Sequence, residues 1–324
     1  MRNGGEVNLS LRVRQVRWEA EGVVTVLFEP ADGGSLPMWS PGAHIDVHLP
    51  GGPVRQYSLC GEPGGGVPWR IGVLREPDSR GGSAAVHERL RPGEIITARG
   101  PRNNFELREA TRYILVAGGI GITPILTMAR EIQRRGVPWT LLYGGRRRAG
   151  MAFLSELDSL AGSAADRGSV VIHPQDEAGH LPLADALREP IPGTLIYCCG
   201  PAPLLSAIQE ASAHWPAGSL VIERFTPAPP AIPAGGDSFE VEARRSGVTV
   251  TVPAGTTIVE ALEEAGVSAM TSCLEGICGT CETKVIDGVP EHRDSLLSEA
   301  ERESNKTMMI CVGRARCAKL VLDI

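Results

Sequence analysis

The sequence lacks the features of an exported or membrane-embedded protein. Its start carries charges where a secretory signal would have an apolar region. The longest apolar run, YILVAGGIGITPIL at residues 113–126, is too short and too rich in glycine to span a bilayer. A chain of 324 residues that is 42% hydrophobic and 22% charged is typical of soluble globular proteins. We therefore expect a cytoplasmic protein of two or three domains with no membrane contact.

The sequence also lacks a disulfide framework and an excess of basic charge. Four of its eight cysteines, Cys60, Cys198, Cys199 and Cys317, follow no spacing typical of paired cysteines. The net charge is −6, and residues 237–324 carry 15 acidic against 9 basic side chains, so the preceding residues are balanced. This distribution argues against nucleic-acid binding. It is compatible with docking on a basic partner surface, and equally with an acidic surface that only aids solubility.

The remaining cysteines have the spacing of an iron–sulfur site. They are Cys273, Cys278, Cys281 and Cys311. The first three form a C-x4-C-x2-C pattern with a distant fourth, which is the plant-type ligand pattern of a 2Fe–2S cluster. A zinc site is the alternative, although zinc usually brings a second close pair of cysteines. Backbone N–H groups of Gly276, Gly279 and Thr280 would point at the cluster sulfurs and raise the reduction potential.

Residues 1–108 are predicted to form an antiparallel β-barrel or sandwich. Segments such as VVTVLFEP and WRIGVLRE are short, rich in branched apolar residues, and separated by clusters of glycine and proline. One stretch differs, because Arg80, Gly81, Gly82 and Ser83 precede the helical sequence AAVHERL, with Ser83 as the expected N-cap. Free N–H groups at such a helix start can bind a phosphate, although most Gly-Gly-Ser turns are only turns.

Residues 109–226 alternate between strands and helices, which predicts a doubly wound parallel sheet. The first strand leads into Gly118, Gly119 and Gly121, and then into a helix with Thr123 as N-cap and Pro124 at its first position. The dinucleotide fingerprint G-x-G-x-x-G fails, because Pro124 stands where the third glycine should be. Two interpretations stay open at this turn: backbone binding of a pyrophosphate, and close packing of strand against helix.

The tract TPAPPAIPAGGDS at residues 226–238 is rich in proline and has no apolar period, so residues 227–236 are predicted to be a linker. Residues 237–324 then form a small third domain. It contains two strands around a turn, a helix over TTIVEALEEAGV, the cysteine loop, and closing strands in CETKVIDG and MMICVGRARCAKLVLDI. A cluster that supplements a modest core suits a domain of about 88 residues.

The order of these segments resembles the phthalate dioxygenase reductase family, which includes vanillate demethylase reductases. RQYSL at residues 55–59 is similar to the family's R-x-Y-S-L flavin motif, and residues 80–83 to its flavin-phosphate loop. Residues 118–124 are similar to its G-G-I-G-I-T-P nicotinamide segment, and residues 199–201 to its C-G-P turn. EHRDSLLSEAE at residues 291–301 is similar to its segment between the third and fourth cysteines. The resemblance spans essentially the whole chain.

The resemblance implies an electron-transfer flavoprotein of three domains. Its implied fold is an antiparallel flavin β-barrel over residues 1–108, a nucleotide-binding α/β domain over residues 109–226, and a C-terminal β-grasp ferredoxin domain over residues 237–324. The implied cofactors are FMN rather than FAD, NADH as hydride donor, and the 2Fe–2S cluster. The implied partner is a terminal Rieske-type oxygenase that accepts the electrons.

The resemblance also implies roles for individual residues. Arg55, Tyr57 and Ser58 would border the isoalloxazine, and Thr123 would lie between flavin and nicotinamide. Phe225 would pack near the flavin, or would otherwise be an ordinary core residue. The expected cofactor-binding residues are Arg55, Gln56, Tyr57, Ser58, Gly72, Val73, Leu74, Arg80, Gly81, Gly82, Ser83, Gly118, Gly119, Gly121, Thr123, Pro124, Cys199, Gly200, Pro201 and Phe225.

Several of these roles stay open at the level of sequence. Ser58 is expected to hydrogen-bond flavin N5, and Arg55 to supply positive charge to the reduced flavin or to the phosphate. Cys199 either lies beside the nicotinamide or is a buried thiol without function. The arginines at residues 146–148 either bind the 2′-phosphate of NADPH or form a solvated loop, and NADH is the preferred donor.

The sequence thus predicts an NADH-dependent reductase that transfers hydride to FMN and passes single electrons through the cluster to an oxygenase. A flavin is required because nicotinamide delivers two electrons at once and the cluster accepts one. No catalytic acid or base is expected, since the task of the protein is to position cofactors. The alternatives are a stand-alone reductase of quinones, ferric chelates or cytochromes, and a redox-sensing interaction protein. Cys60, Cys198 and Cys317 are expected only to pack, and the chain to be a monomer.

Overall fold

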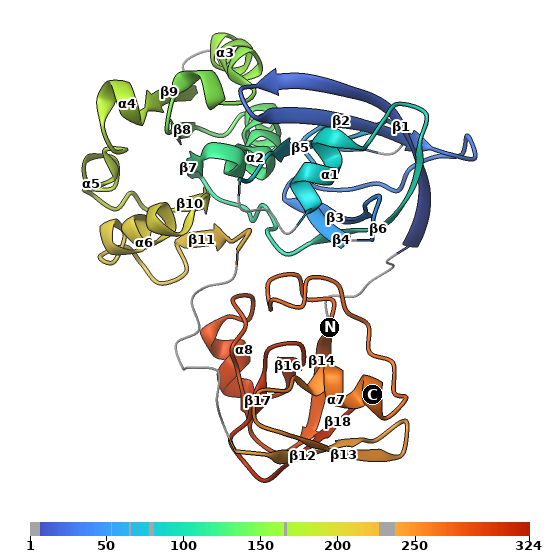
Figure 1. Cartoon of the computed structure of the whole chain (residues 1–324). Coiled ribbons are helices and arrows are strands. Elements are labelled where there is room, and N and C mark those ends of the chain that lie inside the picture. The colour runs from blue at the N-terminus through green and yellow to red at the C-terminus, as the bar shows by residue number, and fades with distance from the viewer. Residues whose placement is uncertain (1–6, 53, 65, 78–80, 165–166, 227–236) are drawn as a thin grey trace. The chain divides into compact units, whose positions relative to one another are not determined.

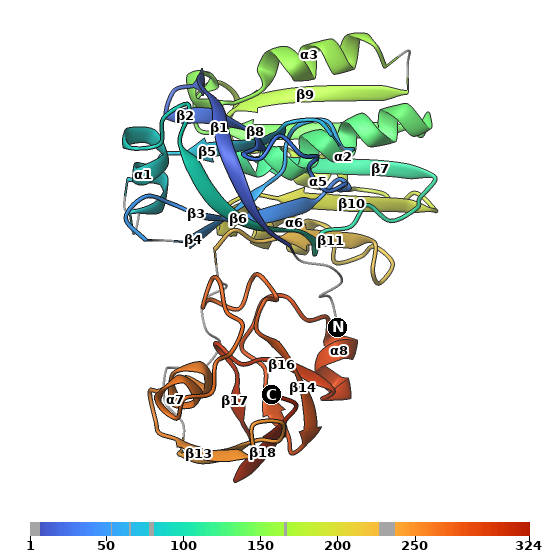
Figure 2. The same ribbon diagram turned by 90° about the vertical axis from the view of Figure 1, so that its right-hand side faces the viewer.

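The computed structural model describes residues 7–52, 54–64, 66–77, 81–164, 167–226 and 237–324. The chain divides into two compact units, one over Gly5–Phe225 and the other containing Thr226–Ile324. Figure 1 and Figure 2 show the larger unit in blue to yellow and the smaller in orange to red. The expected linker at residues 227–236 and the expected phosphate ligand Arg80 lie outside the described residues.

The first part of the larger unit is a six-stranded antiparallel sheet that curls toward a barrel. Its strands are β1 (Val7–Ala20), β2 (Val23–Pro30), β3 (Ala43–His48), β4 (Val54–Ser58), β5 (Trp69–Leu74) and β6 (Ile95–Asn103), in the order β4-β3-β6-β1-β2-β5. A bridge between Leu59 and Ile71 joins β5 to the residue after β4, which brings the two edges together. Inward-facing side chains such as Phe28 and Trp69 form a fully buried core. The short helix α1 (Gly82–Glu88) lies beside β5.

The second part of the larger unit is a parallel sheet in the order β11-β10-β7-β8-β9. Its strands are β7 (Arg112–Gly118), β8 (Trp139–Gly145), β9 (Gly168–Pro174), β10 (Thr194–Cys199) and β11 (Leu220–Glu223). The helices between them are η1 (Gly119–Gly121), α2 (Ile122–Arg135), η2 (Arg148–Gly150), α3 (Leu154–Gly162), α4 (Gln175–Ala178), α5 (Leu183–Ala186) and α6 (Ala202–Ala211).

Helices cover both faces of this parallel sheet. Side chains of α2 and α3 join one apolar cluster, and side chains of α5 and α6 join another. Strands β7 and β10 are therefore buried along almost their whole length, which is why they read as continuous apolar runs. The chain winds outward from β7 to β9 on one side and from β10 to β11 on the other, so the strand order reverses between β7 and β10. The predicted doubly wound sheet is confirmed.

Two tyrosines tie the barrel to the parallel sheet. The Tyr197 hydroxyl on β10 donates a hydrogen bond to the Glu106 carbonyl oxygen and accepts one from the Arg108 N–H, each at 2.8 Å. The Tyr113 hydroxyl on β7 donates to the Arg108 carbonyl oxygen at 2.7 Å. Phe105 packs edge-on against Tyr197 with ring centroids 5.3 Å apart. These contacts hold the segment that connects the two sheets.

The smaller unit is built on a mixed five-stranded sheet in the order β13-β12-β18-β14-β16, with β12 and β18 parallel. Its strands are β12 (Phe239–Ala243), β13 (Val248–Val252), β14 (Glu282–Asp287), β16 (Thr307–Met309) and β18 (Lys319–Leu322), with a separate pair β15 (Pro290–Glu291) and β17 (Arg314–Ala315). Helices α7 (Ile258–Glu264) and α8 (Glu299–Ser304) each begin with a capping box. Leu262 of α7 packs in one core with residues of β12 and β18. The predicted β-grasp domain is confirmed.

The expected N-cap of α1 is wrong. The helix begins at Gly82, and its N-cap is Gly81 in the left-handed conformation, with φ 85°. Glycine adopts that conformation without steric cost, so the chain can turn into the helix two residues earlier. The Ser83 hydroxyl instead accepts a hydrogen bond from the Glu76 N–H at 3.1 Å.

The expected N-cap of α2 is also wrong. The 3-10 turn η1 runs directly into α2, which begins at Ile122 with Gly121 as N-cap, so Thr123 and Pro124 are its second and third residues. The Thr123 hydroxyl therefore donates back to the Ile120 carbonyl oxygen at 2.9 Å. Among the residues that the structure describes, no helix combines the length and apolar content that crossing a bilayer requires.

Candidate cofactor sites

Two of the expected flavin segments meet at the rim of the barrel. The Arg55 side chain on β4 lies over the start of α1, since a Cβ on Gly82 would come within 2.6 Å of Arg55 Cγ and Nε. The neighbouring Gly81 has open space around its Cβ position. Absent side chains thus leave a cradle of backbone N–H groups beside a guanidinium, which fits a phosphate.

The other residues of β4 differ in their surroundings. Ser58 is 5% exposed, and Tyr57 packs against the barrel core, where burial raises the pKa of its phenol. The Gln56 amide donates to Asp46 Oδ1 at 3.0 Å, and Asp46 forms a buried ion pair with both Nη atoms of Arg102, at 2.9 and 2.5 Å. The side chain of Gln56 is therefore engaged within the barrel.

The expected nicotinamide segments converge where the strand order reverses. A Cβ on Gly121 would lie 2.3 Å from the Cys199 carbonyl oxygen, and one on Gly200 would lie 3.1 Å from the Cα of Gly118. The turns after β7 and β10 can approach this closely only with glycine at these positions. By contrast, Gly119 has φ 54° and open space at its Cβ position. Parallel sheets bind ligands in the crevice at such a reversal. Close packing is thus observed at Gly121 and Gly200, and nucleotide binding at this turn stays a prediction.

Strand β5 brings the barrel against this turn. A Cβ on Gly72 would lie 3.0 Å from Thr123 Cγ2 and 3.1 Å from Phe153 Cζ. Leu74 on the same strand packs against the core of the α/β region, and the Val73 carbonyl oxygen lies 3.0 Å from a ring nitrogen of His87. Expected cofactor-binding residues of the barrel and of the α/β region therefore touch within one unit.

Glu223 is a neighbour of this crevice that the sequence analysis did not single out. It ends β11 opposite Cys199, and its Oε2 lies 3.9 Å from Cys199 Sγ. Burial raises the pKa of the Glu223 carboxyl, and burial followed by the nearby carboxylate raises the pKa of Cys199 well above its usual value. Cys199 is thus a neutral thiol at neutral pH. The available signal was an acidic residue in the apolar strand sequence SLVIERF.

Two of the arginines at residues 146–148 are engaged by carboxylates. Arg147 Nη2 lies 3.0 Å from Glu21 Oε1, and Arg148 Nε lies 3.3 Å from Glu177 Oε1. Both pairs are exposed, so each contributes only about 0–1 kcal/mol. They nevertheless lower the net positive charge that the end of β8 offers to a 2′-phosphate.

Four of the five cysteines of the smaller unit, Cys273, Cys278, Cys281 and Cys311, lie together. The Sγ atoms of Cys281 and Cys311 are 3.1 Å apart, and hydrogen bonds with Cys278 and Cys311 lower the pKa of Cys273. No three His, Cys, Asp or Glu side chains in the described part of the chain converge on one metal-ion position. The four sulfurs instead form one connected group, in which Cys273 contacts Cys278 and Cys311, and Cys311 also contacts Cys281. Four thiolates in one group fit a cluster with two irons and four cysteine ligands.

Backbone N–H groups in the cysteine loop reach cysteine sulfurs, and their predicted contacts with the cluster sulfurs stay a prediction. The N–H of Thr280 lies 3.5 Å from Cys278 Sγ, and the N–H of Glu275 lies 3.3 Å from Cys273 Sγ. Gly276 and Gly279 have φ 69° and 79°, which the tight loop requires and which L side chains rarely adopt.

Residues 291–301 pack against this loop. The Ser295 N–H donates to the Gly276 carbonyl oxygen at 3.0 Å, and a Cβ on Gly276 would lie 3.0 Å from the Cα of Asp294. Asp294 Oδ2 accepts from the N–H groups two and three residues further on, at 3.0 and 2.8 Å, and Arg302 donates to its carbonyl oxygen. Asp294 and Arg302 were missed because nothing local in the sequence shows which segment backs the loop.

The remaining candidates are less informative. Phe225 lies two residues after β11 and is 38% exposed, while Pro201 is the N-cap of α6. Cys60 and Cys198 are buried, which raises the pKa of each thiol to about 12. Cys317 is half-buried, and its sulfur accepts a hydrogen bond from the Val289 N–H at 3.1 Å.

Comparisons with known proteins agree with these sites. Residues 115–210 match the model of the oxidoreductase NAD-binding domain, and residues 241–316 match that of the 2Fe-2S iron-sulfur cluster binding domain. The vanillate O-demethylase oxidoreductase of Pseudomonas sp. (strain HR199 / DSM 7063) is 41% identical over 315 residues, which are 96% of this chain and 98% of that protein. The tetrachlorobenzoquinone reductase of Sphingobium chlorophenolicum is 39% identical over 317 residues, which are 98% of each chain. The solved structure of phthalate dioxygenase reductase matches with a TM-score of 0.69 at 32% identity, over 99% of this chain and 98% of that chain.

A flavin-type barrel, a nucleotide-binding sheet and a four-cysteine ferredoxin unit define the class of iron–sulfur flavoprotein oxidoreductases. Within that class, the chain belongs to the phthalate dioxygenase reductase family. The predicted family, fold class and enzyme class are confirmed, and so are the cofactors FMN, NADH and a 2Fe–2S cluster. The zinc alternative and the redox-sensing interaction protein are not supported by these matches.

Proposed function

We propose that this chain is the reductase component of an oxygenase system. It takes hydride from NADH to FMN and passes single electrons through its 2Fe–2S cluster to a terminal oxygenase of the Rieske type. The contact of Gly72 with Thr123 carries the proposal, because it joins a barrel strand that holds expected cofactor-binding residues to the helix start expected to lie between flavin and nicotinamide. A relative named vanillate O-demethylase oxidoreductase supports it.

FMN would be held at the rim of the barrel. Arg55 with Gly81 and Gly82 would bind the phosphate, because its guanidinium already lies over Gly82. The Ser83 hydroxyl accepts a hydrogen bond from the preceding turn, so its own proton is left to donate to a phosphate oxygen. Ser58 would contact the isoalloxazine, and when bound the flavin supplies the conversion between two-electron and one-electron chemistry.

The dinucleotide would lie at the reversal of the parallel sheet. Residues 118–124 would offer the backbone of the glycine turn, and residues 199–201 would border the nicotinamide with the neutral thiol of Cys199. NADH is favoured over NADPH, because carboxylates already engage Arg147 and Arg148. Comparison of kcat/KM for the two cofactors tests this preference.

An anaerobic titration with NADH tests the proposed function. The purified chain should show flavin and iron–sulfur absorption bands, both bleached by NADH, and acid should release FMN. Oxygen uptake with candidate terminal oxygenases and their substrates then identifies the partner. A chain without flavin, or one whose bands NADH leaves unchanged, would overturn the proposal.

We also infer that the chain is a monomer. Light scattering measures its oligomeric state.

A stand-alone quinone reductase is the second candidate, because one relative is named tetrachlorobenzoquinone reductase. Cys281→Ser, which removes a cluster ligand, separates the two functions. Quinone reduction directly from the flavin would persist in this variant. Electron delivery to an oxygenase through the cluster would be lost.

A further inference from the structure

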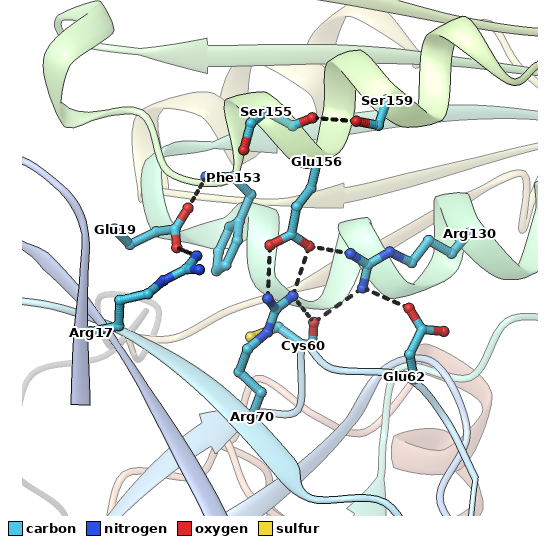
Figure 3. A network of polar contacts seen from close by, with 10 residues as sticks. All are labelled: Arg17, Glu19, Cys60, Glu62, Arg70, Arg130, Phe153, Ser155, Glu156 and Ser159. Carbon is cyan, nitrogen blue, oxygen red and sulfur yellow. Dashed lines mark hydrogen bonds and ion pairs between the residues drawn. The ribbon is translucent and has the colours of Figure 1, made fainter. Parts of the chain in front are cut away.

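A network of charged side chains borders the contact between the barrel and the α/β region (Figure 3). Arg70 of β5 binds both carboxylate oxygens of Glu156 on α3, at 2.7 and 2.9 Å. Arg130 of α2 binds the same carboxylate, and its Nη1 lies 3.6 Å from Glu62 Oε1. Both arginines also donate to the Cys60 carbonyl oxygen, at 2.7 and 3.4 Å. We call Arg70, Arg130 and Glu156 the Glu156 network.

The Glu156 network is largely shielded from water. Its side chains are 18%, 20% and 22% exposed for Arg70, Arg130 and Glu156. Burial opposes ionisation of Glu156, but hydrogen bonds and charge from Arg70, then from Arg130, hold its pKa below the ordinary value. Each charged side chain of the network therefore helps to hold the others in position. Removal of one of them leaves the remaining charges uncompensated.

Phe153 packs against strand β5, which also carries Arg70. It precedes α3, is fully buried, and has φ 62°, a left-handed conformation that strains a non-glycine residue. The Arg70 guanidinium lies 5.1 Å from the centre of the Phe153 ring. The backbone N–H of Phe153 donates to Glu19 Oε1 on β1 at 3.1 Å. Contacts with two barrel strands thus offset the strain and hold the start of α3 in place.

The Glu156 network and the contact of Gly72 with Thr123 both connect strand β5 to helix α2. Arg70 and Gly72 are two residues apart on β5, so they share one face of the strand. Thr123 and Arg130 are seven residues apart on α2, so they share one face of the helix. Gly72 meets Thr123 directly, whereas Arg70 reaches Arg130 through Glu156.

We propose that the Glu156 network positions the start of α2 against β5 and thereby sets the separation of flavin and nicotinamide for hydride transfer. Its residues act through β5 and α2, so they are positioning residues. The inference rests on the proposed function, because this separation matters only if FMN and NADH bind at the sites inferred above. Hydride transfer needs near-attack geometry, and a misplacement of about 1 Å can slow such a reaction about a hundredfold.

The test is Glu156→Gln, which keeps the size of the side chain but removes the charge that binds both arginines. We expect the rate of flavin reduction at saturating NADH, measured by stopped flow, to fall about ten- to hundredfold. The dissociation constants of FMN and NAD⁺ should change less than about twofold. The absorbance that NAD⁺ induces over reduced flavin should weaken, since it depends on overlap of the two rings.

The matched control is Glu131→Gln, which removes a carboxylate that pairs with Arg134 and Arg135 on its own helix α2. It should leave the hydride-transfer rate unchanged. If Glu156→Gln lowers Tm but keeps the rate and the ring-overlap absorbance, the network is only structural and the inference is wrong. A wild-type chain that binds FMN but is not reduced by NADH would instead overturn the proposed function and the inference with it.

Two further variants keep the test open if Glu156→Gln does not fold. Arg70→Lys keeps the charge but loses the two-pronged contact with Glu156, and should slow hydride transfer by a smaller factor. Gly72→Ala leaves the network intact but crowds Thr123 and Phe153 by a few tenths of an ångström. It should also slow hydride transfer while FMN stays bound, and normal rates in both variants would contradict the inference.

Discussion

Several glycines matter to the proposed cofactor sites because they have no Cβ atom. A Cβ on Gly82 would strike Arg55, one on Gly121 would strike the carbonyl of Cys199, and one on Gly276 would come within 2.7 Å of a neighbouring valine. Each glycine therefore allows a close approach that no other residue type permits. The structure thus shows motif glycines that let neighbouring segments pack closely, whereas their binding of cofactors stays a prediction.

Ser58 on β4 is 5% exposed and is expected to contact the flavin. Ser58→Ala should slow flavin reduction by NADH about fivefold, because one hydrogen bond contributes about 1 kcal/mol. FMN should remain bound, since its phosphate is held elsewhere. Single-turnover reduction and flavin fluorescence measure the two effects, and an unchanged reduction rate would refute the role of Ser58.

The second prediction at this scale concerns Gly276 in the cysteine loop. Gly276→Ala combines a φ of 69° with contacts of 2.7 Å to Val312 and 3.0 Å to Asp294. The variant should lose most of its bound iron and sulfide while flavin reduction by NADH continues. Gly266→Ala is the control, because that glycine has a similar φ of 78° but open space at its Cβ position. Equal iron content in both variants would contradict the steric explanation.

At the scale of elements, β5 is the strand on which both parts of the larger unit depend. It closes the barrel through the bridge from Leu59 to Ile71, meets α2 through Gly72, and reaches α3 through Arg70. A strand shared in this way would couple the position of the proposed flavin site to that of the proposed nucleotide site. The coupling uses an ion network rather than apolar contact alone, so it responds to pH.

This dependence gives a prediction for acid unfolding. The folded pKa of Glu156 lies below its ordinary value of 4.5, so the carboxylate contributes its full stability above about pH 4.5. That contribution is lost as the pH falls through the folded pKa. The difference in unfolding free energy between wild type and Glu156→Gln should therefore be largest at pH 7 and shrink below pH 4.5. Urea unfolding at several pH values measures it, and a difference that stays constant would contradict the assignment.

At the scale of the whole molecule, the two units divide the work of the electron-transfer chain. The unit over residues 5–225 carries the expected flavin and nucleotide sites, and the unit with the four cysteines carries the excess of acidic charge. Helix α7 of that unit ends with Glu263 and Glu264, both exposed, where the helix dipole disfavours negative charge. Helix stability does not explain these two acidic residues, so they serve to test the docking surface proposed for this acidic unit.

The prediction at this scale is a loss of electron delivery on charge reversal. Glu263→Lys with Glu264→Lys should slow reduction of the partner oxygenase at least about tenfold at low salt, and by less at high salt. NADH reduction of the flavin should not change. Glu189→Lys with Glu210→Lys alters net charge equally on exposed sites of the other unit and is the control. Equal rates for the two double variants would reject docking at α7.

Local patterns in the sequence predicted the cysteine ligands, the flavin and nicotinamide segments and the three kinds of fold, and the structure and the family comparison confirm the folds. Ligand spacing, strand period and turn glycines are local patterns, so each is readable along the chain. The helix starts were predicted wrongly, because the glycines at 81 and 121 allow the chain to turn into the helix before Ser83 and Thr123.

The distant residues that support these sites become visible only when the chain has folded. Arg70 and Glu156 are 86 residues apart, yet they share an ion pair, and Asp294 braces a loop whose first cysteine lies 21 positions earlier in the chain. Such contacts depend on how strands and helices pack, and a charged residue in an ordinary helix gives no local sign of its partner. The cofactor motifs are therefore legible in the sequence, whereas the residues that hold them at working distance appear only in the folded chain.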